Sequence, residues 1–222
     1  MKRVWIVGLV ALAGCGPREV TKFNATQPPP PNLAGDWRVH EMKDINATIA
    51  APTEWRLPSE GSGVIDMSQF GGEGQAKFTD EQMKNDLKLP DDLIKQTHED
   101  EKLPEGTSLL LNKRIVGETA YITQIELKHK TVPGGTTLKA QADEVGNIYM
   151  GESGAEKIEL PVGPAMVIKK QTKSMGGEVG HHIHYILVNN EDVYVITLQT
   201  EQDASMITDI AQQVAESFRL KK

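Results

Sequence analysis

HIHYILV at residues 182–188 and VYVITL at residues 193–198 form the stretch of sequence that decides the fold. Both runs are dominated by β-branched, aromatic and other apolar residues, and Asn189-Asn190-Glu191-Asp192 separates them. Apolar runs of this length on either side of a short polar link are typical of a β-hairpin. The stretch therefore predicts two antiparallel strands close to the C-terminus.

A helix is predicted directly after this hairpin. Apolar residues recur there at steps of three, one, three and four: Ile207, Ile210, Ala211, Val214 and Phe218. This spacing gathers them on one face of a helix, while Gln212, Gln213 and Glu216 fall on the opposite face. Asp203 is expected to cap the helix at its start.

Further strands are predicted upstream of the hairpin. The apolar runs at 109–116 and 121–127 flank Gly117-Glu118 and are typical of a second hairpin. Shorter strands are expected at 37–42, 47–50, 64–67, 148–150 and 165–172. Several antiparallel strands with helices beside them indicate an α+β sandwich, in which an antiparallel β-sheet is flanked by helices.

Residues 79–105 differ in composition from the predicted strands. Thr79 is expected to cap a helix at 80–89, and Pro90 to open a second short helix that ends near residue 97. From residue 80 onwards the segment holds nine acidic residues against four lysines. Such a run is typical of a solvated helical face, so the segment is predicted to be an acidic helical insertion.

The first 14 residues are predicted to be a signal peptide. Met1-Lys2-Arg3 gives a positive start, and an apolar run of about ten residues follows, shorter than the roughly 20 that a membrane-spanning helix needs. Leu12-Ala13-Gly14-Cys15 ends this run and resembles the lipobox of bacterial lipoproteins. In that family the signal is cut before the cysteine, and the thiol is linked to diacylglycerol. The resemblance implies that Cys15 is lipidated and becomes the first residue of the mature chain.

Residues 15–33 are predicted to form a lipid-anchored, proline-rich tether. The segment has too few apolar residues for a core, and Pro28-Pro29-Pro30-Pro31 favours polyproline II. At about 3.1 Å per residue, such a spacer can hold the domain up to roughly 50 Å from the bilayer. The lipoprotein resemblance implies an extracytoplasmic location at the bacterial cell membrane. Gly16, in place of an Asp, favours the outer membrane if the source has one.

The overall charge limits the classes of partner. The full sequence has a formal net charge of −7, and cleavage after residue 14 would remove Lys2 and Arg3 but no acid. An acidic chain argues against nucleic acid as a partner, because phosphates are bound through Lys and Arg. It also argues against a polybasic grip on anionic lipid. Cys15 is the only cysteine, so no disulfide can form within the chain.

Three stretches of the remaining sequence resemble PsbP-like domains. A short strand followed by Pro52 and Trp55 resembles their opening, and LPVGPA at 160–165 resembles their central glycine turn. The hairpin at 185–197 and the helix that ends in Ala215-Glu216-Ser217-Phe218-Arg219 resemble their closing hairpin and C-terminal helix.

This resemblance spans residues 45–219 and implies that residues 34–222 form one PsbP-like α+β domain. PsbP-like proteins include extrinsic photosystem subunits and bacterial lipoproteins, and most are non-enzymatic binding or scaffolding modules. The resemblance therefore implies a non-catalytic role. The acidic insertion departs from the family pattern and leaves a specific family partner open.

The densest group of potential metal ligands is the histidine cluster at the start of the C-terminal hairpin. On a strand, His182 and His184 share one face, and two imidazoles at this spacing can chelate Zn²⁺ if a third ligand converges. His40, His98 or His129 could supply that ligand from elsewhere in the chain. The alternative is an ordinary polar strand face, and both interpretations stay open.

Other catalytic and binding patterns are missing from the sequence. The acids Asp91-Asp92 and Glu99-Asp100-Glu101 lack the spacing of a calcium loop. No G-x-S-x-G, H-E-x-x-H, G-x-G-x-x-G or P-loop pattern occurs. Paired carboxylates for glycoside hydrolysis cannot be judged from sequence, because their spacing is three-dimensional.

Three hypotheses about function follow. The first is a lipid-anchored, non-catalytic binding or scaffolding lipoprotein with an envelope protein or glycan as its partner. The second is an envelope receptor for a small ligand or for zinc, with His182 and His184 as candidate ligands. The third is an envelope hydrolase, which the missing motifs disfavour.

Overall fold

The computed structural model describes residues 21–24, 26–27, 36–57, 62–66, 75–94, 103–113, 123–148, 154–173 and 179–221. The predicted signal peptide at 1–14 and Cys15 lie outside the described residues. Among the helices of the described part, none has the length and apolar character needed to cross a membrane.

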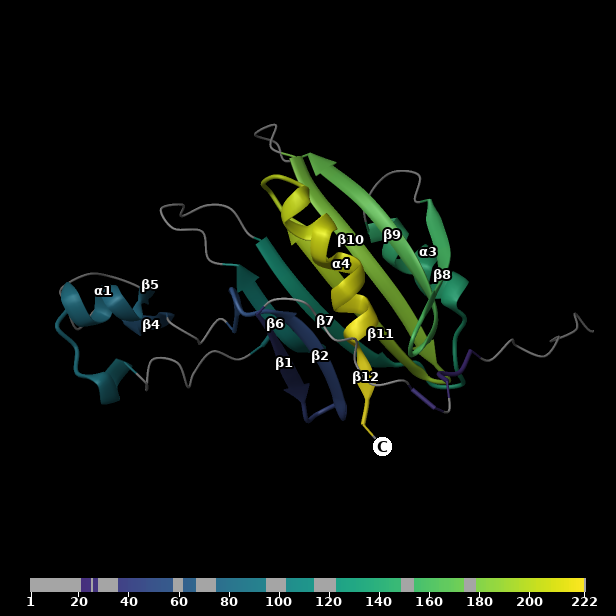
Figure 1. Cartoon of the computed structure of the whole chain (residues 1–222), viewed down its shortest axis with the longest axis horizontal. Coiled ribbons are helices and arrows are strands. Elements are labelled where there is room, and N and C mark those ends of the chain that lie inside the picture. The colour runs from purple at the N-terminus through teal and green to yellow at the C-terminus, as the bar shows by residue number, and fades with distance from the viewer. Residues whose placement is uncertain are drawn as a thin grey trace, which may run out of the picture.

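A seven-stranded sheet forms the centre of the fold (Figure 1), with the strand order β3-β6-β7-β11-β10-β9-β8. The strands are β3 (Trp55–Arg56), β6 (Thr107–Lys113), β7 (Thr123–Thr131), β8 (Ala155–Leu160), β9 (Gly163–Lys173), β10 (Val179–Asn189) and β11 (Asp192–Thr200). All neighbours pair antiparallel. The predicted α+β class, an antiparallel sheet flanked by helices, is confirmed.

Both predicted hairpin pairings are present in this sheet. β10 pairs with β11 as far as Asn189 and Asp192, so that only Asn190 and Glu191 form the turn. Asn190 has a φ of 63°, a left-handed conformation that Asn adopts more readily than most residues. β6 pairs with β7 as expected, and the residues that connect these two strands lie outside the described part.

One face of the sheet carries the main hydrophobic core. Helix α4 (Ser205–Ser217) packs there together with a three-stranded sheet of β1 (Trp37–Met42), β2 (Ala47–Pro52) and β12 (Arg219–Leu220). The predicted apolar stripe of α4 is confirmed, because Ile207, Ala211 and Val214 are buried. Phe218 follows the last residue of the helix and is 0% exposed, so its ring packs in the core between helix and sheet.

The start of α4 differs slightly from the prediction. Ala204, not Asp203, is the N-cap residue and makes no side-chain cap. The carboxylate of Asp203 instead accepts a hydrogen bond of 2.9 Å from the backbone N–H of Ser205. Asp203, one residue before the N-cap, therefore still accepts a hydrogen bond from a backbone N–H of the first helical turn.

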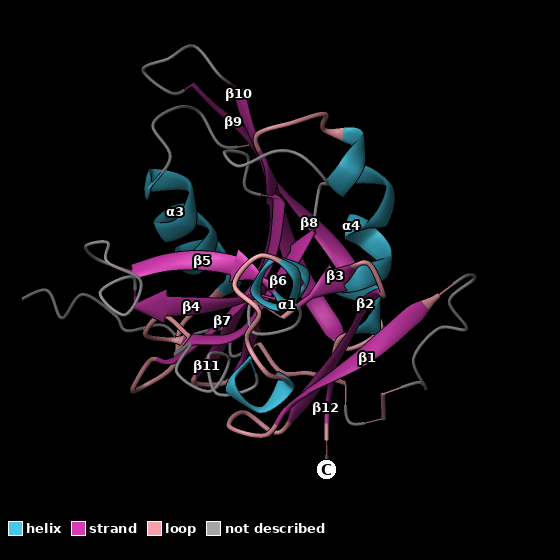
Figure 2. Ribbon diagram, turned by 90° about the vertical axis from the view of Figure 1, so that its left-hand side faces the viewer, coloured by secondary structure: helices cyan, strands magenta, loops and turns pink. Residues whose placement is uncertain are grey.

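Helix α3 (Leu138–Ile148) lies on the opposite face of the seven-stranded sheet (Figure 2). Its Leu138 packs with Val188 and Val193, and its Ala142 packs with Ile168 and Ile186. The local sequence pattern predicts no helix here, and the predicted strand from Ile148 is wrong, because Ile148 is the last residue of α3.

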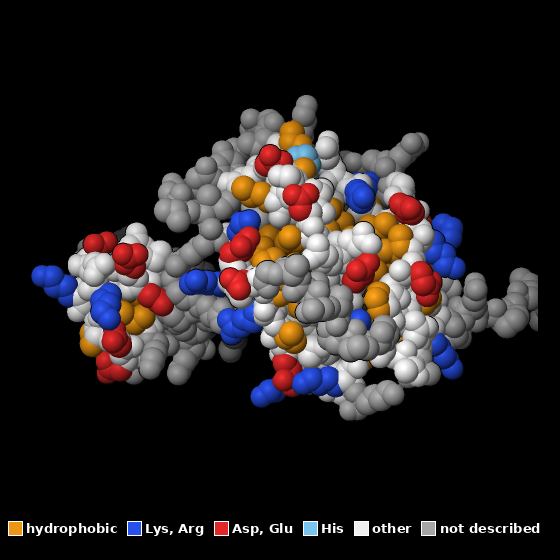
Figure 3. All heavy atoms as spheres, in the orientation of Figure 1, with side chains coloured by type: hydrophobic (Ala, Val, Ile, Leu, Met, Phe, Trp, Pro, Cys, Tyr) orange, Lys and Arg blue, Asp and Glu red, His pale blue; other side chains and the backbone are white. Residues whose placement is uncertain are grey.

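The acidic segment forms a small unit apart from the main sheet. The hairpin of β4 (Ser62–Asp66) and β5 (Gln75–Thr79) leads into α1 (Asp80–Asn85), which Thr79 caps as predicted. Met83 and Ile94 are buried against Phe78 in a separate apolar cluster. Helix α1 ends at Asn85, earlier than the predicted residue 89. Figure 3 shows Asp and Glu side chains gathered on this unit, beside the main body.

Part of the predicted tether lies against the domain. Phe23 packs on the main core, and Gln27 accepts a hydrogen bond of 3.1 Å from the backbone N–H of Leu220. The structure thus differs from the predicted boundary at residue 34. The physical reason is Phe23, a single large apolar residue within an otherwise polar segment, whose burial removes its ring from water.

Candidate functional site

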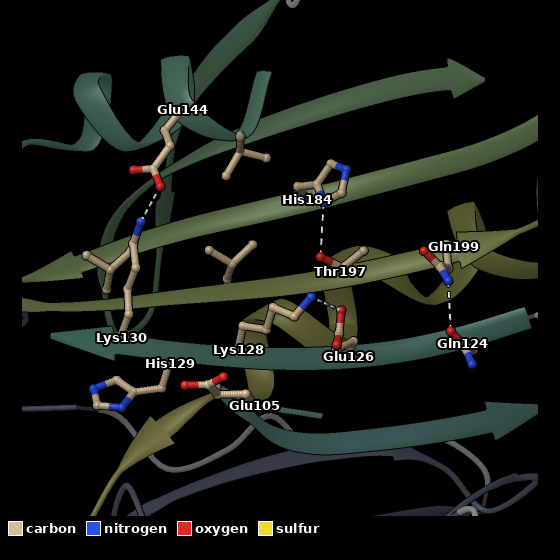
Figure 4. Close-up of a pocket in the computed structure, with 14 residues that line it drawn as sticks. Glu105, Gln124, Glu126, Lys128, His129, Lys130, Glu144, His184, Thr197 and Gln199 are labelled. Atoms are coloured by element: carbon tan, nitrogen blue, oxygen red, sulfur yellow. Dashed lines mark hydrogen bonds and ion pairs between the residues drawn. The ribbon is translucent and has the colours of Figure 1, made fainter. Parts of the chain in front are cut away.

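The side of the sheet that carries α3 contains a groove of about 620 Å³ (Figure 4). Helix α3 packs on β9, β10 and the Val193 end of β11, and beside it β11 and the neighbouring β7 line the groove. Alternate residues of these strands point into it: Gln124, Glu126, Lys128 and Lys130 from β7, and Val193, Val195, Thr197 and Gln199 from β11. The volume lies within the range of small-molecule sites.

Two ion pairs line the groove. Lys130 Nζ lies 2.6 Å from the carboxylate of Glu144, which reaches down from α3. Lys128 Nζ lies 3.1 Å from Glu126, whose other oxygen accepts a 2.9 Å hydrogen bond from the hydroxyl of Thr107. The hydrogen bond from Lys130 is the main cause that lowers the pKa of Glu144. Each positive charge is thus matched by a carboxylate.

Neutral polar groups form the next part of the groove, as Figure 4 shows. The side-chain amide of Gln199 donates a hydrogen bond of 2.7 Å to the side-chain oxygen Oε1 of Gln124. Nδ1 of His184 lies 3.0 Å from the hydroxyl of Thr197. The surface of the groove therefore offers amides, a hydroxyl and an imidazole between the two ion pairs.

His184 is uncharged at neutral pH. Its side chain is 2% exposed, and burial, followed by the positive charges of His182, Lys128 and Lys170, lowers its pKa to about 4. Burial also lowers the pKa of His182, while a hydrogen bond with Gln199 acts in the opposite direction. Both imidazoles thus favour the neutral form, which is the form that binds metals.

The predicted histidine pair is brought together on one face of β10. The rings of His182 and His184 are stacked, with centroids 6.0 Å apart and planes 9° from parallel. Nε2 of His182 lies 3.1 Å from the hydroxyl of Thr172 on β9. Among the described residues, no group of three or more His, Cys, Asp or Glu side chains converges in a way that could hold a metal ion.

The proposed third ligands are spread over the fold. His40 is buried on β1, in the three-stranded sheet, and His129 contacts Asp192 at 3.1 Å and stacks near Tyr194. His98 lies outside the described residues, as do Glu99-Asp100-Glu101. Asp91 is exposed and pairs with Lys84 at 3.0 Å.

A second, smaller hollow of about 340 Å³ lies on the other face of the sheet, beside the start of α4. Lys169, His181 and Ala204 are among its lining residues. His181 alternates with His182 along β10 and so faces α4.

The sequence analysis missed most of the groove. The alternation of Gln124, Glu126, Lys128 and Lys130 with apolar residues was a readable signal for a polar strand face. The contribution of Glu144 could not be found, because α3 itself was missed. Of the described residues that line the groove, none is a Ser or Cys that could serve as a nucleophile.

Comparison with known proteins gives a likeness of fold only. No family model matches the chain, and no curated protein sequence matches it. A crystal structure from Bacteroides thetaiotaomicron is similar, with a TM-score of 0.45 and 8% identity over 86% of this chain. The match covers 50% of that protein, so the chain spans about half of its length.

The solution structure of cyanobacterial PsbP (CyanoP) from Synechocystis sp. PCC 6803 is also similar. It has a TM-score of 0.35 and 13% identity, and the match covers 95% of this chain and 99% of that one. At these scores, neither structure bears on ligand or activity.

Proposed function

We propose that the protein is a lipid-anchored, extracytoplasmic and non-catalytic binding protein, and that the groove beside α3 is its binding surface. The lipobox resemblance at Leu12-Ala13-Gly14-Cys15 supports the anchor. The observation that carries the binding role is the groove of about 620 Å³, lined by two ion pairs, an amide pair and the His184–Thr197 contact.

The charge arrangement in the groove favours binding over catalysis. Glu126 and Glu144 each form an ion pair with a lysine, and the hydrogen bond from Lys130 lowers the pKa of Glu144, so Glu144 does not act as a proton donor at neutral pH. An incoming polar ligand can exchange with these half-exposed ion pairs at little cost, because such pairs are weak in water. A polar ligand, such as a segment of an envelope protein or a glycan, fits this chemistry.

Site-specific crosslinking in cells tests the proposed binding surface. A photo-crosslinking residue at Lys128 lies in the groove, whereas one at the exposed Gln213 lies on α4 and serves as the matched control. We expect the Lys128 position to capture a discrete envelope partner that the Gln213 position does not. Identical products from both positions would contradict the assignment of the groove.

The anchor is tested separately through the single cysteine. Metabolic labelling with palmitate should mark the protein and place it in the membrane fraction. The variant Cys15→Ser should lose the label and the membrane association together. Membrane association without label in the unchanged protein would contradict the lipoprotein proposal.

Zinc binding by His182 and His184 is the second candidate. The observation in its favour is the pair of stacked imidazoles whose pKa values are both lowered, so that both rings are neutral near pH 7. Calorimetric titration with zinc should give a saturable heat that His182→Ala abolishes and His129→Ala, on β7, leaves in place. The absence of heat at micromolar zinc would rule out this candidate.

A further inference from the structure

The segment 21–27 is attached to one end of the seven-stranded sheet by backbone and side-chain hydrogen bonds. The N–H of Asn190 donates to the carbonyl oxygen of Thr21 at 2.9 Å, and the N–H of Phe23 donates to the side chain of Asn189 at 3.1 Å. The N–H of Asn24 donates to the carbonyl oxygen of Val162 at 2.9 Å. The segment thus joins the β10–β11 turn to the turn between β8 and β9.

Phe23 reinforces this attachment through its ring. The ring lies 5.8 Å from that of Tyr194 and 6.4 Å from that of Phe218, the latter in an edge-on arrangement. Gly163 makes room for it: a side chain at Gly163 would place its Cβ 3.3 Å from Cα of Phe23. Gly163 also has a φ of 147°, a conformation that other residues rarely adopt.

The attachment of residues 21–27 changes the role expected for the proline run, which follows these residues in the sequence. Gln27 contacts Leu220, and the backbone carbonyl oxygen of Asp36 accepts a hydrogen bond from the N–H of Thr53, so residues 28–35 connect two points that are both fixed on the domain. In the sequence, the prolines therefore follow the first attached residues and do not separate them from Cys15. Only residues 16–20 separate Cys15 from the attached Thr21.

We propose that the lipid on Cys15 and the attached segment 21–24 together hold the Asn189–Asp192 end of the sheet next to the membrane surface. This inference rests on the proposed lipid anchor. Six residue steps from Cys15 to Thr21 span at most about 22 Å in any conformation. The partner of this end of the domain is therefore a lipid headgroup surface, because only the short linker of residues 16–20 separates the lipid from the domain.

The opposite end of the sheet then points away from the bilayer. Along β11, eight residue steps from Asp192 to Thr200 cover about 27 Å. The start of α4 and the hollow at Lys169 and His181 lie at that far end. A soluble envelope partner meets the far end and the side with the groove, while the turns at 132–135 and 189–192 face the lipid.

Fluorescence transfer to the membrane tests this orientation in the lipidated full-length protein. Since Cys15 is the only cysteine and its thiol carries the lipid, a new cysteine is the only free thiol for a dye. Pro133→Cys marks the turn beside Glu191, and Glu201→Cys marks the far end. Both positions are exposed.

In phosphatidylcholine vesicles with a lipid-bound acceptor dye, we expect quenching at position 133 to exceed that at position 201 by about twofold or more, given the length of β11. The additional change Phe23→Ala should release the segment from the domain. The next attached residue is then Asp36, and the chain from Cys15 to Asp36 can extend to about 70 Å. The difference between the two positions should then largely disappear. Thermal unfolding of each variant verifies that the sheet remains folded.

The controls separate this inference from the anchor on which it rests. If the intact mass shows no lipid on Cys15, the proposed anchor is wrong. If the lipid is present but positions 133 and 201 are quenched equally, the anchor stands and the orientation is overturned. Asn189→Ala, which removes the hydrogen bond to the N–H of Phe23 and leaves the Phe23 ring in place, should reduce the difference less than Phe23→Ala does.

Discussion

The two faces of the seven-stranded sheet differ sharply although the same strands build both. One face carries Ile125, Leu127, Ile196 and Leu198, which are 0% exposed under α4 and the three-stranded sheet. On the other face β7 presents charged and amide side chains to the groove, and β11 presents Thr197 and Gln199 beside Val193 and Val195. One face thus holds the fold together, which leaves the other free to carry a binding surface.

The largest expected effect comes from a truncation on the core face. Ile196→Ala should lower the free energy of unfolding by about 2–5 kcal/mol, because it leaves a cavity in the packed core. Urea denaturation monitored by circular dichroism measures this. The matched variant Gln199→Ala on the groove face of the same strand should change the stability much less. Equal losses would break the distinction between the two faces.

The next effect is a pH dependence that arises on the groove face. His184 has a pKa of about 4 in the folded protein against 6.5 in the unfolded chain, so protonation favours the unfolded state. The unfolded chain binds more protons between pH 6.5 and 4, and stability is therefore full above pH 6.5 and falls as the pH drops towards 4. The loss should be on the order of 3 kcal/mol.

This dependence is measured as the urea midpoint at several pH values. Between pH 6.5 and 4, the urea midpoint of the variant His184→Gln should depend less steeply on pH than that of the unchanged protein. The carboxylates titrate alike in both proteins, so the difference in slope reports on His184. An unchanged slope would show that His184 is as accessible as an ordinary surface histidine.

A smaller effect is expected where the N-terminal segment meets the core face. Phe23→Ala should cost about 1–2 kcal/mol, less than a fully buried phenylalanine, because the ring is only half-buried. Limited proteolysis provides a second measurement, in which cleavage between residues 21 and 35 should become faster. A stability and a cleavage rate both equal to those of the unchanged protein would contradict the observed attachment.

The smallest effect is expected for an ion pair across the groove. Glu144→Gln should change the free energy of unfolding by no more than about 1 kcal/mol, since Lys130 and Glu144 are both roughly half-exposed. The difference should shrink further in high salt. A loss comparable to that of Ile196→Ala would mean that α3 is held to the sheet by charge, and not by Leu138 and Ala142.

The sequence predicted those elements whose pattern is local. The stripe of α4 and the alternation of the C-terminal hairpin both appear within a few residues, and both are confirmed. Helix α3 was missed because its apolar face is narrow, with Leu138, Ala142 and Val145 among polar residues and Gly146. Tertiary contacts with Val188 and Ile186 stabilise it, and these are invisible in a local window.

The candidate site was predictable only in part, for the same reason. The shared face of His182 and His184 follows from strand periodicity. The groove, by contrast, requires β7 to pair with β11 at sequence separations of 61 to 77 residues, and requires Glu144 to come from a third element. The attachment of Phe23 likewise depends on Asn189, 166 residues away. Such contacts are set by the assembled sheet.

The position of β11 in the sheet also determines when the chain can fold. β11 is central and lies between β7 and β10, yet it is among the last strands in the sequence. Until residues 192–200 emerge, the strands form two separate groups, β3-β6-β7 and β10-β9-β8, and neither α4 nor β12 is present to cover them. A chain delivered from its N-terminus therefore stays open until nearly all of it has been released. Late closure of this kind is what the proposed export of the chain would need, because an exported chain would have to cross the membrane before it folds.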